Sequence, residues 1–293
     1  MTAPSSVTAP SFMTASGLMT VTTVMTVTTF MTVTTFTRVT PVAAPGTRQV
    51  HLWTVPLDGP AADTAAALAP SVLDPGERRR ATRLLLPEDR RRWTTARVTL
   101  RRVLGAYTGL PPARIAFAYG RHGRPRLDGP GGRRLRFNLT HSRDRALLAV
   151  CRDTPVGADL EHLDAGPPDE GGLDELAEAV LAPPELGAYR RLPYPDRRAA
   201  LLRRWTGKEA LLKATGRGVT LSAVRRVTVP DGAGPAYGVP GAWTLLRPAP
   251  GGPYTAAIAV PRDTRTGNDK DWEVVEIVPA DFNDAVDRAV DHG

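Results

Sequence analysis

Two carboxylates, Asp159 and Glu161, lie one residue apart in the segment 155–161, whose sequence PVGADLE is typical of a β-strand. Side chains alternate between the two faces of a strand, so both carboxylates point the same way. Carboxylates at this spacing repel each other unless a cation lies between them, and their oxygens suit Mg²⁺. An Asp-x-Glu pair is also common on a solvated strand face, so this pattern alone leaves both interpretations open.

A second group of polar residues lies in the helical segment WTGKEALLK, residues 205–213. Glu209 and Lys213 are four residues apart and therefore share one helix face, where they could form an ordinary surface ion pair. The chain has 35 Arg but three Lys, and two of the lysines, Lys208 and Lys213, fall within six residues. This bias suggests positions where a compact ammonium is needed, for example against phosphate oxygens.

Two further segments could contact a phosphate. In FNLTHS, an apolar strand ends in Thr140 and His141, and His141 could bind a phosphate when protonated or could cap the strand. The segment GRHGRPRL, residues 120–127, is a basic loop. Gly and Pro also mark ordinary turns, and the loop lacks the Gly-Lys-Ser/Thr of a P-loop. Neither segment decides between these interpretations alone.

The elements that must position these residues alternate between strands and helices, which favours an α+β fold over a doubly wound parallel sheet. We expect two halves of similar content, 49–151 and 152–262. The predicted helices cover 61–69, 75–108, 173–182, 183–192, 196–214 and about 280–290. The predicted strands cover 49–55, 115–119, 135–139, 145–151, 155–161, 224–229, 242–247, 254–260 and 272–278, with a Gly/Arg loop at 120–134.

Composition limits the class of protein. The 293 residues carry a net charge of +8, which favours anionic partners without choosing among them. A single cysteine, Cys151, excludes an intrachain disulfide, and its apolar surroundings predict a buried, inert thiol. No segment is typical of a transmembrane helix or of a secretory signal, so we expect a cytoplasmic protein.

The two ends differ from the rest of the chain. Residues 1–47 are rich in Thr and repeat MTVTTV, MTVTTF and MTVTTF, which predicts a disordered extension. Residues 263–293 form an acidic C-terminal extension with no assigned role.

Taken in order, GRPRL, FNLTHS, GADLE and WTGKEALLK resemble the signature motifs of Sfp-type 4'-phosphopantetheinyl transferases. The typical forms are G-K/R-P, F-N-x-S-H-S, G-x-D-x-E and W-x-x-K-E-x-x-x-K. The resemblance covers about residues 49–262. It implies a pseudo-dimer of two similar α+β halves with the active site at their junction. The N-terminal half would bind the nucleotide of coenzyme A, and the C-terminal half would carry the Mg²⁺ and catalytic motifs.

The resemblance also implies roles for matching residues. Three carboxylates would ligate Mg²⁺: Asp159, Glu161 and Glu209. The coenzyme would be bound by a set of cationic and polar residues: Arg80, Arg92, Arg124, Thr140, His141 and Lys213. Within this set, Arg80 and Arg92 would meet the 3'-phosphate and adenine, although neighbouring arginines could serve instead. Glu185 falls where the family has another acidic residue near the metal.

The implied reaction moves the phosphopantetheine arm of coenzyme A onto a serine of an apo acyl or peptidyl carrier protein, as in polyketide and non-ribosomal peptide synthesis. Glu209 would activate the serine, with Glu185 as the second choice, and Lys213 would stabilise the departing charge. We expect a monomer that binds neither nucleic acid nor membrane. Two other functions remain open from the residues alone: a Mg²⁺-dependent phosphodiesterase or nuclease, and a nucleic-acid-binding protein that uses the Arg-rich segment 78–102.

Overall fold

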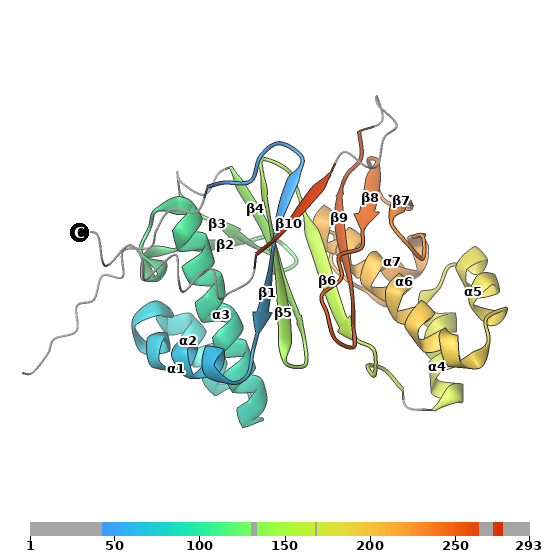
Figure 1. Cartoon of the computed structure of the whole chain (residues 1–293), viewed down its shortest axis with the longest axis horizontal. Helices are drawn as coiled ribbons and strands as arrows, with labels where there is room; N and C mark the ends of the chain where they lie inside the picture. Colours follow the sequence, from blue (N-terminus) through green and yellow to red (C-terminus); the bar gives the residue numbers. More distant parts are fainter. Residues whose placement is uncertain (1–42, 130–133, 168, 264–271, 278–293) are drawn as a thin grey trace, which may run out of the picture. The chain divides into compact units, whose positions relative to one another are not determined.

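The structure is a computed structural model that describes residues 43–129, 134–167, 169–263 and 272–277 of the chain. Helices and strands are mixed along these residues, and the strands of two four-stranded sheets lie between helices (Figure 1). The predicted α+β class is therefore confirmed.

The first four-stranded sheet has the strand order β10-β1-β5-β4. Its strands are β1 (Gln49–Pro56), β4 (Leu135–Ser142), β5 (Arg145–Arg152) and β10 (Glu273–Ile277). β5 pairs antiparallel with both β1 and β4, whereas β10 pairs with β1 in parallel. The strand predicted at 272–278 is thus present as β10. This strand from near the C-terminus lies beside β1, the first strand of the described chain.

Helices and a small hairpin cover this sheet. They are α1 (Pro60–Val72), α2 (Pro75–Thr82), α3 (Pro87–Thr108), the short 3₁₀ helix Pro112–Arg114, β2 (Phe117–Tyr119) and β3 (Pro125–Leu127). The single helical stretch predicted over 75–108 is divided into α2 and α3. Pro87 causes the division, because the residue before a proline avoids the helical region and Leu86 has a ψ of 129°. β3 lies inside the segment predicted to be a loop, where it pairs with β2.

The sheet of the C-terminal half has the order β6-β9-β8-β7 and is antiparallel throughout. Its strands are β6 (Gly157–His162), β7 (Gly234–Ala236), β8 (Trp243–Leu246) and β9 (Tyr254–Pro261). The helices of this half are α4 (Glu170–Val180), α5 (Pro183–Arg190), α6 (Tyr194–Thr215) and α7 (Leu221–Arg226).

The strand predicted at 224–229 is wrong, because residues 224–226 belong to α7 and Val227 follows as the C-cap of that helix. The Thr220 side chain accepts a hydrogen bond from the backbone N–H of Ala223 and so caps a helix start. Thr228 forms an isolated antiparallel bridge with Tyr237. The β-branched residues of this segment had favoured a strand, but the cap and packing of Val224 into the core determine the helix.

Helix α6 packs on β6 with almost no space between their backbones. A Cβ added to Gly157 would lie 2.0 Å from the Ala210 carbonyl oxygen and 2.4 Å from the Ala214 nitrogen. Gly157 therefore permits an approach that any side chain would prevent. This close contact brings the polar face of α6 within reach of the carboxylates of β6.

The two sheets share a hydrophobic core, which includes Leu52 of β1, Leu147 and Cys151 of β5, Leu160 of β6 and Ile258 of β9. This core joins the two four-stranded sheets. Most of the disordered extension expected over residues 1–47, namely residues 1–42, lies outside the described residues, as does the helix expected at about 280–290. Among the helices that the structure describes, none combines the length and apolar composition needed to cross a membrane.

Candidate active site between strands β4 and β6

Polar side chains of β4 reach across to β6, although these two strands belong to different sheets. The Oδ1 of Asn138 accepts a hydrogen bond from the backbone N–H of Ala158 at 2.7 Å. Two residues further along β4, the Thr140 hydroxyl donates to Oδ1 of Asp159 at 3.0 Å. Alternate residues of a strand share a face, so Asn138 and Thr140 lie on the same face of β4. This face contacts β6, the strand that carries Asp159.

Ser142 continues the same row of side chains. Its hydroxyl donates to Oε2 of Glu161 at 2.8 Å and accepts from the backbone N–H of His162 at 3.1 Å. Neither Asn138 nor Ser142 is among the site residues expected from the sequence. The signal that could have found them is their alternation with Thr140 along a strand that ends in polar residues.

Helix α6 supplies an ammonium and a third carboxylate. Nζ of Lys213 lies 2.5 Å from Oδ1 of Asp159 and 3.0 Å from Oε2 of Glu209, which is one helical turn away. Lys213 also lies 3.5 Å from the hydroxyl of Thr140. The structure therefore brings together five of the predicted site residues: Thr140, Asp159, Glu161, Glu209 and Lys213.

Burial makes the carboxyl groups of Asp159 and Glu161 difficult to ionise. Desolvation raises the pKa of Asp159 to about 7; Lys213 opposes this shift, whereas the negative charge of Glu209 adds to it. Desolvation also raises the pKa of Glu161, and the hydrogen bond from Ser142 opposes that shift. Desolvation lowers the pKa of His141, and the nearby Lys213 ammonium lowers it further.

The carboxylate oxygens of this cluster suit a divalent cation. Among the described residues, however, no three His, Cys, Asp or Glu side chains lie close enough together to hold a metal ion. Oδ2 of Asp159 is buried and has no hydrogen-bond partner. A buried carboxylate oxygen without a partner is costly, and a bound cation would satisfy it. Lys213 already lies between Asp159 and Glu209 and neutralises part of their charge.

Glu185 does not join this cluster. It lies in the first turn of α5, where its Oε2 accepts from the backbone N–H of Ala182 at 2.8 Å. Its Oε1 accepts from the backbone N–H of Val229, also at 2.8 Å. Both carboxylate oxygens are therefore engaged in holding the backbone, and these contacts do not support a role for Glu185 near a metal.

The partner of Glu185 is Lys208, whose Nζ lies 2.6 Å from Oε2. The ammonium also donates to three backbone carbonyls at 2.7–3.1 Å, those of Val180, Val224 and Val227. The lysine bias in the sequence thus has two causes. Lys213 lies in the polar cluster, whereas Lys208 is fully buried and holds the ends of α4 and α7.

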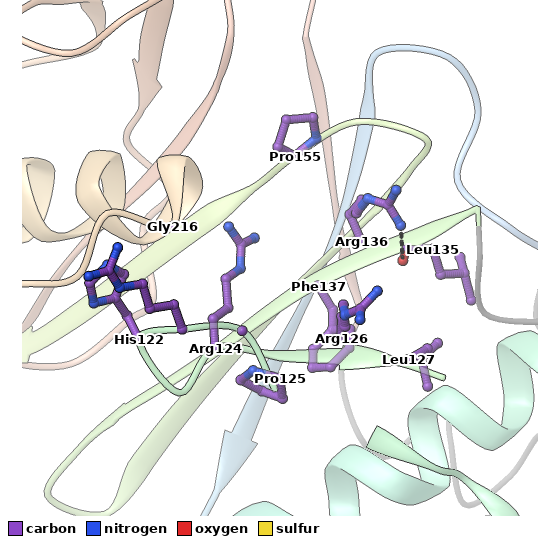
Figure 2. Close-up of a pocket in the computed structure, with 12 residues that line it drawn as sticks. His122, Arg124, Pro125, Arg126, Leu127, Leu135, Arg136, Phe137, Pro155 and Gly216 are labelled. Carbon is purple, nitrogen blue, oxygen red and sulfur yellow. Dashed lines mark hydrogen bonds between the residues drawn. The ribbon is translucent and has the colours of Figure 1, made fainter. Parts of the chain in front are cut away.

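Arg124, in the loop between β2 and β3, links this hairpin to the end of α6 and to the residue before β6. Its Nη1 donates to the carbonyls of Lys213 and Ala214 at 2.6 and 2.8 Å, and its Nη2 donates to the carbonyl of Val156 at 2.8 Å. Figure 2 shows Arg124 between Gly216 at the end of α6 and Arg136 on β4. A cation here complements the negative end of the helix dipole. Arg124 also lines a pocket of about 610 Å³, whose walls include Arg126 and Arg136.

Two further pockets, which adjoin each other, open beside the cluster of Asp159, Glu209 and Lys213. The first, of about 430 Å³, is lined by Arg80, His141 and the aromatic residues Trp93 and Tyr119. The second, of about 300 Å³, is lined by Lys213 and Arg124. Gly123, Pro125 and Asn138 line both, so the pockets adjoin. Arg92 lines neither pocket.

The arrangement gathers carboxylates, an ammonium and arginines around adjoining pockets, a chemistry suited to a phosphorylated ligand. Residues 155–245 match the family described as the 4'-phosphopantetheinyl transferase superfamily. The 4'-phosphopantetheinyl transferase HetI of Nostoc sp. is 39% identical over 217 residues, which cover 72% of this chain and 87% of HetI. The chain belongs to the 4'-phosphopantetheinyl transferase superfamily.

Two other relatives are similar over shorter segments. Protein slr0495 of Synechocystis sp. is 31% identical over 172 residues, or 59% of this chain and 67% of that protein. The 4'-phosphopantetheinyl transferase psf-1 of Bacillus pumilus is 30% identical over 132 residues, or 45% and 53% of the two chains. The family that the four sequence motifs indicate is therefore confirmed.

Proposed function

We propose that this protein transfers the phosphopantetheine arm of coenzyme A to a serine of an apo acyl or peptidyl carrier protein and releases 3',5'-ADP. The observation that carries the proposal is the cluster of Asp159, Glu209 and Lys213 beside pockets lined by arginines. The family places the activity in the class of holo-carrier-protein synthases. The rival functions of nuclease and nucleic-acid-binding protein gain no support from the relatives.

In the proposed reaction, the serine oxygen forms a bond to the β-phosphorus of coenzyme A. The bond from that phosphorus to the oxygen of the departing 3',5'-ADP breaks, and the serine loses its proton. Glu209 is our candidate for accepting this proton, because its side chain is on α6 beside Lys213 and has no further fixed partner among the described residues.

Lys213 would stabilise the negative charge that develops on the diphosphate oxygens. Its ammonium is held between Asp159 and Glu209, so its position is set before the substrate arrives. Thr140 and His141 would contact the coenzyme from the end of β4, where His141 also lines the larger of the two pockets that adjoin the cluster. Arg124 would act mainly by holding the end of α6, because its guanidinium is engaged with backbone carbonyls.

Mg²⁺ is part of the proposal. Asp159 and Glu209, with Glu161 next to them on β6, would hold the ion, which would neutralise charge on the coenzyme phosphates. The unpartnered Oδ2 of Asp159 and the raised pKa of that carboxyl support this assignment.

Two similar halves within one chain are also part of the proposal. Each half has a four-stranded sheet and one long helix, α3 or α6. Helix α3 begins at Pro87 and α6 begins directly after Pro193, and both end at a glycine with positive φ. Because the site lies between strands of the two halves, a single chain could complete it. We therefore expect a monomer, located in the cytoplasm with coenzyme A and the carrier proteins.

Intact-mass spectrometry tests the function directly. An apo carrier protein is incubated with this enzyme, coenzyme A and Mg²⁺, and we expect it to gain the mass of one phosphopantetheine arm. Adding EDTA should prevent the gain. No gain on several acyl and peptidyl carriers, with an enzyme shown to be folded, would reject the proposal.

A further inference from the structure

The pocket of about 610 Å³ beside the β2–β3 hairpin has no part in the proposed transfer reaction, because neither Lys213 nor Asp159 lines it. Its walls come from the hairpin, from β4, from Pro155 before β6 and from the end of α6. It adjoins the pocket that Lys213 lines, and the two share four residues: His122, Arg124, Pro125 and Gly216.

Guanidinium groups surround this pocket. Among the described residues that line it, none is acidic and four are arginines: Arg121, Arg124, Arg126 and Arg136. Figure 2 shows Arg124, Arg126 and Arg136 around the pocket. Burial lowers the pKa of Arg124, and the positive charge of Arg136 lowers it further, so the two guanidinium groups lie close enough to repel each other. Like charges gathered around one cavity favour an anion within it.

Arg124 keeps hydrogen-bond donors for such an anion. A guanidinium carries five N–H groups in a fixed planar arrangement, and three of them donate to the carbonyls of Val156, Lys213 and Ala214. Among the described residues, no acceptor takes the N–H of Nε or the second N–H of Nη2. The three backbone contacts fix the plane of the group, so its remaining donors are positioned before a ligand arrives.

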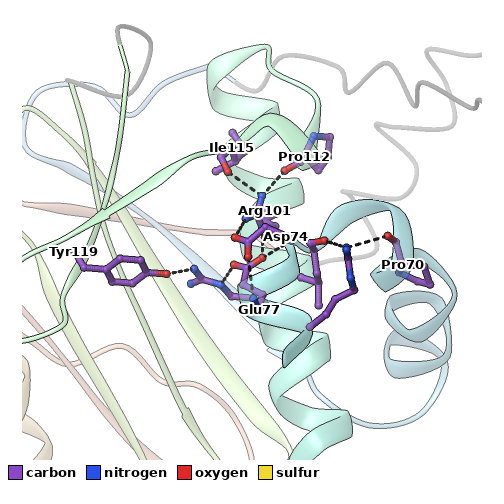
Figure 3. Close-up of polar contacts among 10 residues, drawn as sticks. Pro70, Asp74, Glu77, Arg101, Pro112, Ile115 and Tyr119 are labelled. Carbon is purple, nitrogen blue, oxygen red and sulfur yellow. Dashed lines mark hydrogen bonds and ion pairs between the residues drawn. The ribbon is translucent and has the colours of Figure 1, made fainter. Parts of the chain in front are cut away.

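The arginines of α3 show the opposite arrangement. Arg97 and Arg101 share the buried carboxylate of Glu77, and the contact between Nε of Arg101 and Oε2 of Glu77 measures 2.6 Å (Figure 3). Arg92 of the same helix pairs with Asp58 at 2.7 Å. Each of these positive charges therefore has a carboxylate partner within the fold.

The pocket arginines have fewer acids near them. Arg121 and Arg126 are exposed and form no ion pair among the described residues. Asp153, in the turn after β5, pairs with Arg134 at 2.7 Å. The hydrogen bond from Arg134 lowers the pKa of Asp153, and the charge of Arg136 contributes to the same shift. One carboxylate thus serves more than one arginine of this edge, and the pocket keeps a surplus of positive charge.

The rest of the pocket wall is apolar. It consists of side chains from the hairpin, from β4 and from the segment before β6: Pro125, Leu127, Leu135, Phe137 and Pro155. An apolar wall with a few fixed polar groups is typical of a small-molecule site, and the volume lies within the range of roughly 300–1,000 Å³ that such sites have. An inorganic anion would leave this apolar wall unused.

We propose that this pocket binds a small organic anion, with its carboxylate or phosphate held by the four arginines and its apolar part against the wall of Pro125 and Phe137. Arginine suits both head groups, because its planar fork matches their oxygen atoms. The ligand is distinct from coenzyme A, whose diphosphate would lie beside Lys213 in the adjoining pocket. The inference goes beyond the proposed function and does not depend on it.

Ligand-observed NMR tests the inference with four probes: hexyl phosphate, hexanoate, 1-hexanol and inorganic phosphate. We expect the better of the two organic anions to bind at least about tenfold more tightly than hexanol, because charged hydrogen bonds hold its head group. That anion identifies which head group the pocket prefers. Inorganic phosphate should bind at least about tenfold more weakly than hexyl phosphate, because it lacks the apolar part.

Nitrogen-15 NMR spectra of the full chain locate the bound probe. The largest amide shifts should fall on Arg126, Arg136 and Phe137, and they should persist when coenzyme A is added at a level that shifts the amide of Lys213. Shifts centred on Asp159 and Lys213, or displacement of the probe by coenzyme A, would overturn the inference. Probe shifts at the pocket, together with no effect of coenzyme A on Lys213, would count against the proposed function alone.

The double variant Arg121→Gln/Arg126→Gln removes two exposed charges without breaking an ion pair of the described structure. Its preference for the organic anion over hexanol should fall at least about fivefold. Arg225→Gln is the matched control, because Arg225 is an exposed arginine of α7 that does not line the pocket, and it should keep the wild-type preference. A folded double variant with the full preference would overturn the inference, as would a wild-type protein that binds hexanol equally well.

Discussion

The ammonium of Lys213 lies 2.5 Å from Oδ1 of Asp159, so a charge on helix α6 is fixed against a carboxylate on strand β6. The contact depends on Gly157, which lets the two backbones approach each other. The second oxygen of Asp159 is buried without a partner. One oxygen of this carboxylate therefore binds the Lys213 ammonium, and the other could be satisfied by a metal ion, which is the basis of the first prediction.

Asp159→Asn should reduce arm transfer by about a hundredfold or more, because the charge that would bind Mg²⁺ and orient Lys213 is lost. The measurement is the rate of carrier modification followed by intact mass. Asp164→Asn, in the exposed turn after β6, is the control and should transfer at the wild-type rate. A folded Asp159→Asn protein with Mg²⁺-dependent transfer near the wild-type rate would show that Asp159 is not a metal ligand.

Mg²⁺ binding should depend on pH around neutrality. Burial raises the pKa of Asp159 to about 7, so this carboxyl is protonated below that pH and must lose a proton to bind the ion. We expect the Mg²⁺ affinity to fall about tenfold between pH 8 and pH 6, as one competing proton requires.

The stability of the protein should respond in the same sense. A raised folded-state pKa contributes stability at low pH that is lost as the pH rises through about 7, because the buried carboxyl must then ionise. Mg²⁺ should therefore raise the melting temperature more at pH 8 than at pH 6. Equal shifts at both pH values would contradict the assignment, and Asp159→Asn should abolish the difference.

Ser142→Ala should weaken Mg²⁺ binding, because the Ser142 hydroxyl joins the Glu161 carboxylate to the backbone N–H of His162. Loss of a side chain that orients a metal ligand typically reduces affinity about ten- to a hundredfold. Mg²⁺ titration by calorimetry measures the change, and Ser142→Thr, which keeps a hydroxyl, should recover most of it. Equal binding by Ser142→Ala and wild type would mean that Glu161 needs no support from β4.

The sequence predicts the site better than it predicts the chain path around it. Motif spacing identifies Asp159, Glu161, Glu209 and Lys213, and the structure brings them together because strand and helix periodicity leave few alternatives. Glu185 was assigned by its place relative to the motifs. Its actual partner, Lys208, is distant from it in the sequence, and a buried ion pair of this kind leaves no local pattern.

Local patterns also fail where long-range packing decides the structure. The β-branched residues near Val224 favour a strand, but the Thr220 cap and the core determine a helix. The different surroundings of Arg92 and Arg97 could not be predicted, because ten arginines lie between residues 71 and 104 and only the tertiary partners distinguish them. Arg92 is neutralised by acids, whereas Arg97 is fixed by Glu77 at a pocket wall.

Cys151 should be unreactive in the folded protein. It is fully buried in the core between the sheets, and desolvation raises the pKa of its thiol to about 12, so thiolate is scarce at neutral pH. Labelling with a disulfide reagent at pH 8 should proceed only as fast as the protein opens and should become rapid in denaturant. Rapid native labelling would show that the core between the two sheets opens readily.

Lys208→Met should destabilise the protein by about 3–5 kcal/mol, because it leaves the Glu185 carboxylate buried without its partner. Urea unfolding monitored by circular dichroism measures the change. In the double variant Glu185→Gln/Lys208→Met, which has no buried charge here, part of the lost stability should return.

The folded fraction of Glu185→Gln should transfer the arm at close to the wild-type rate, since Glu185 holds the start of α5 and the Val229 backbone. A stable Glu185→Gln protein without transfer would instead show that Glu185 takes part in the reaction, as the family resemblance implies.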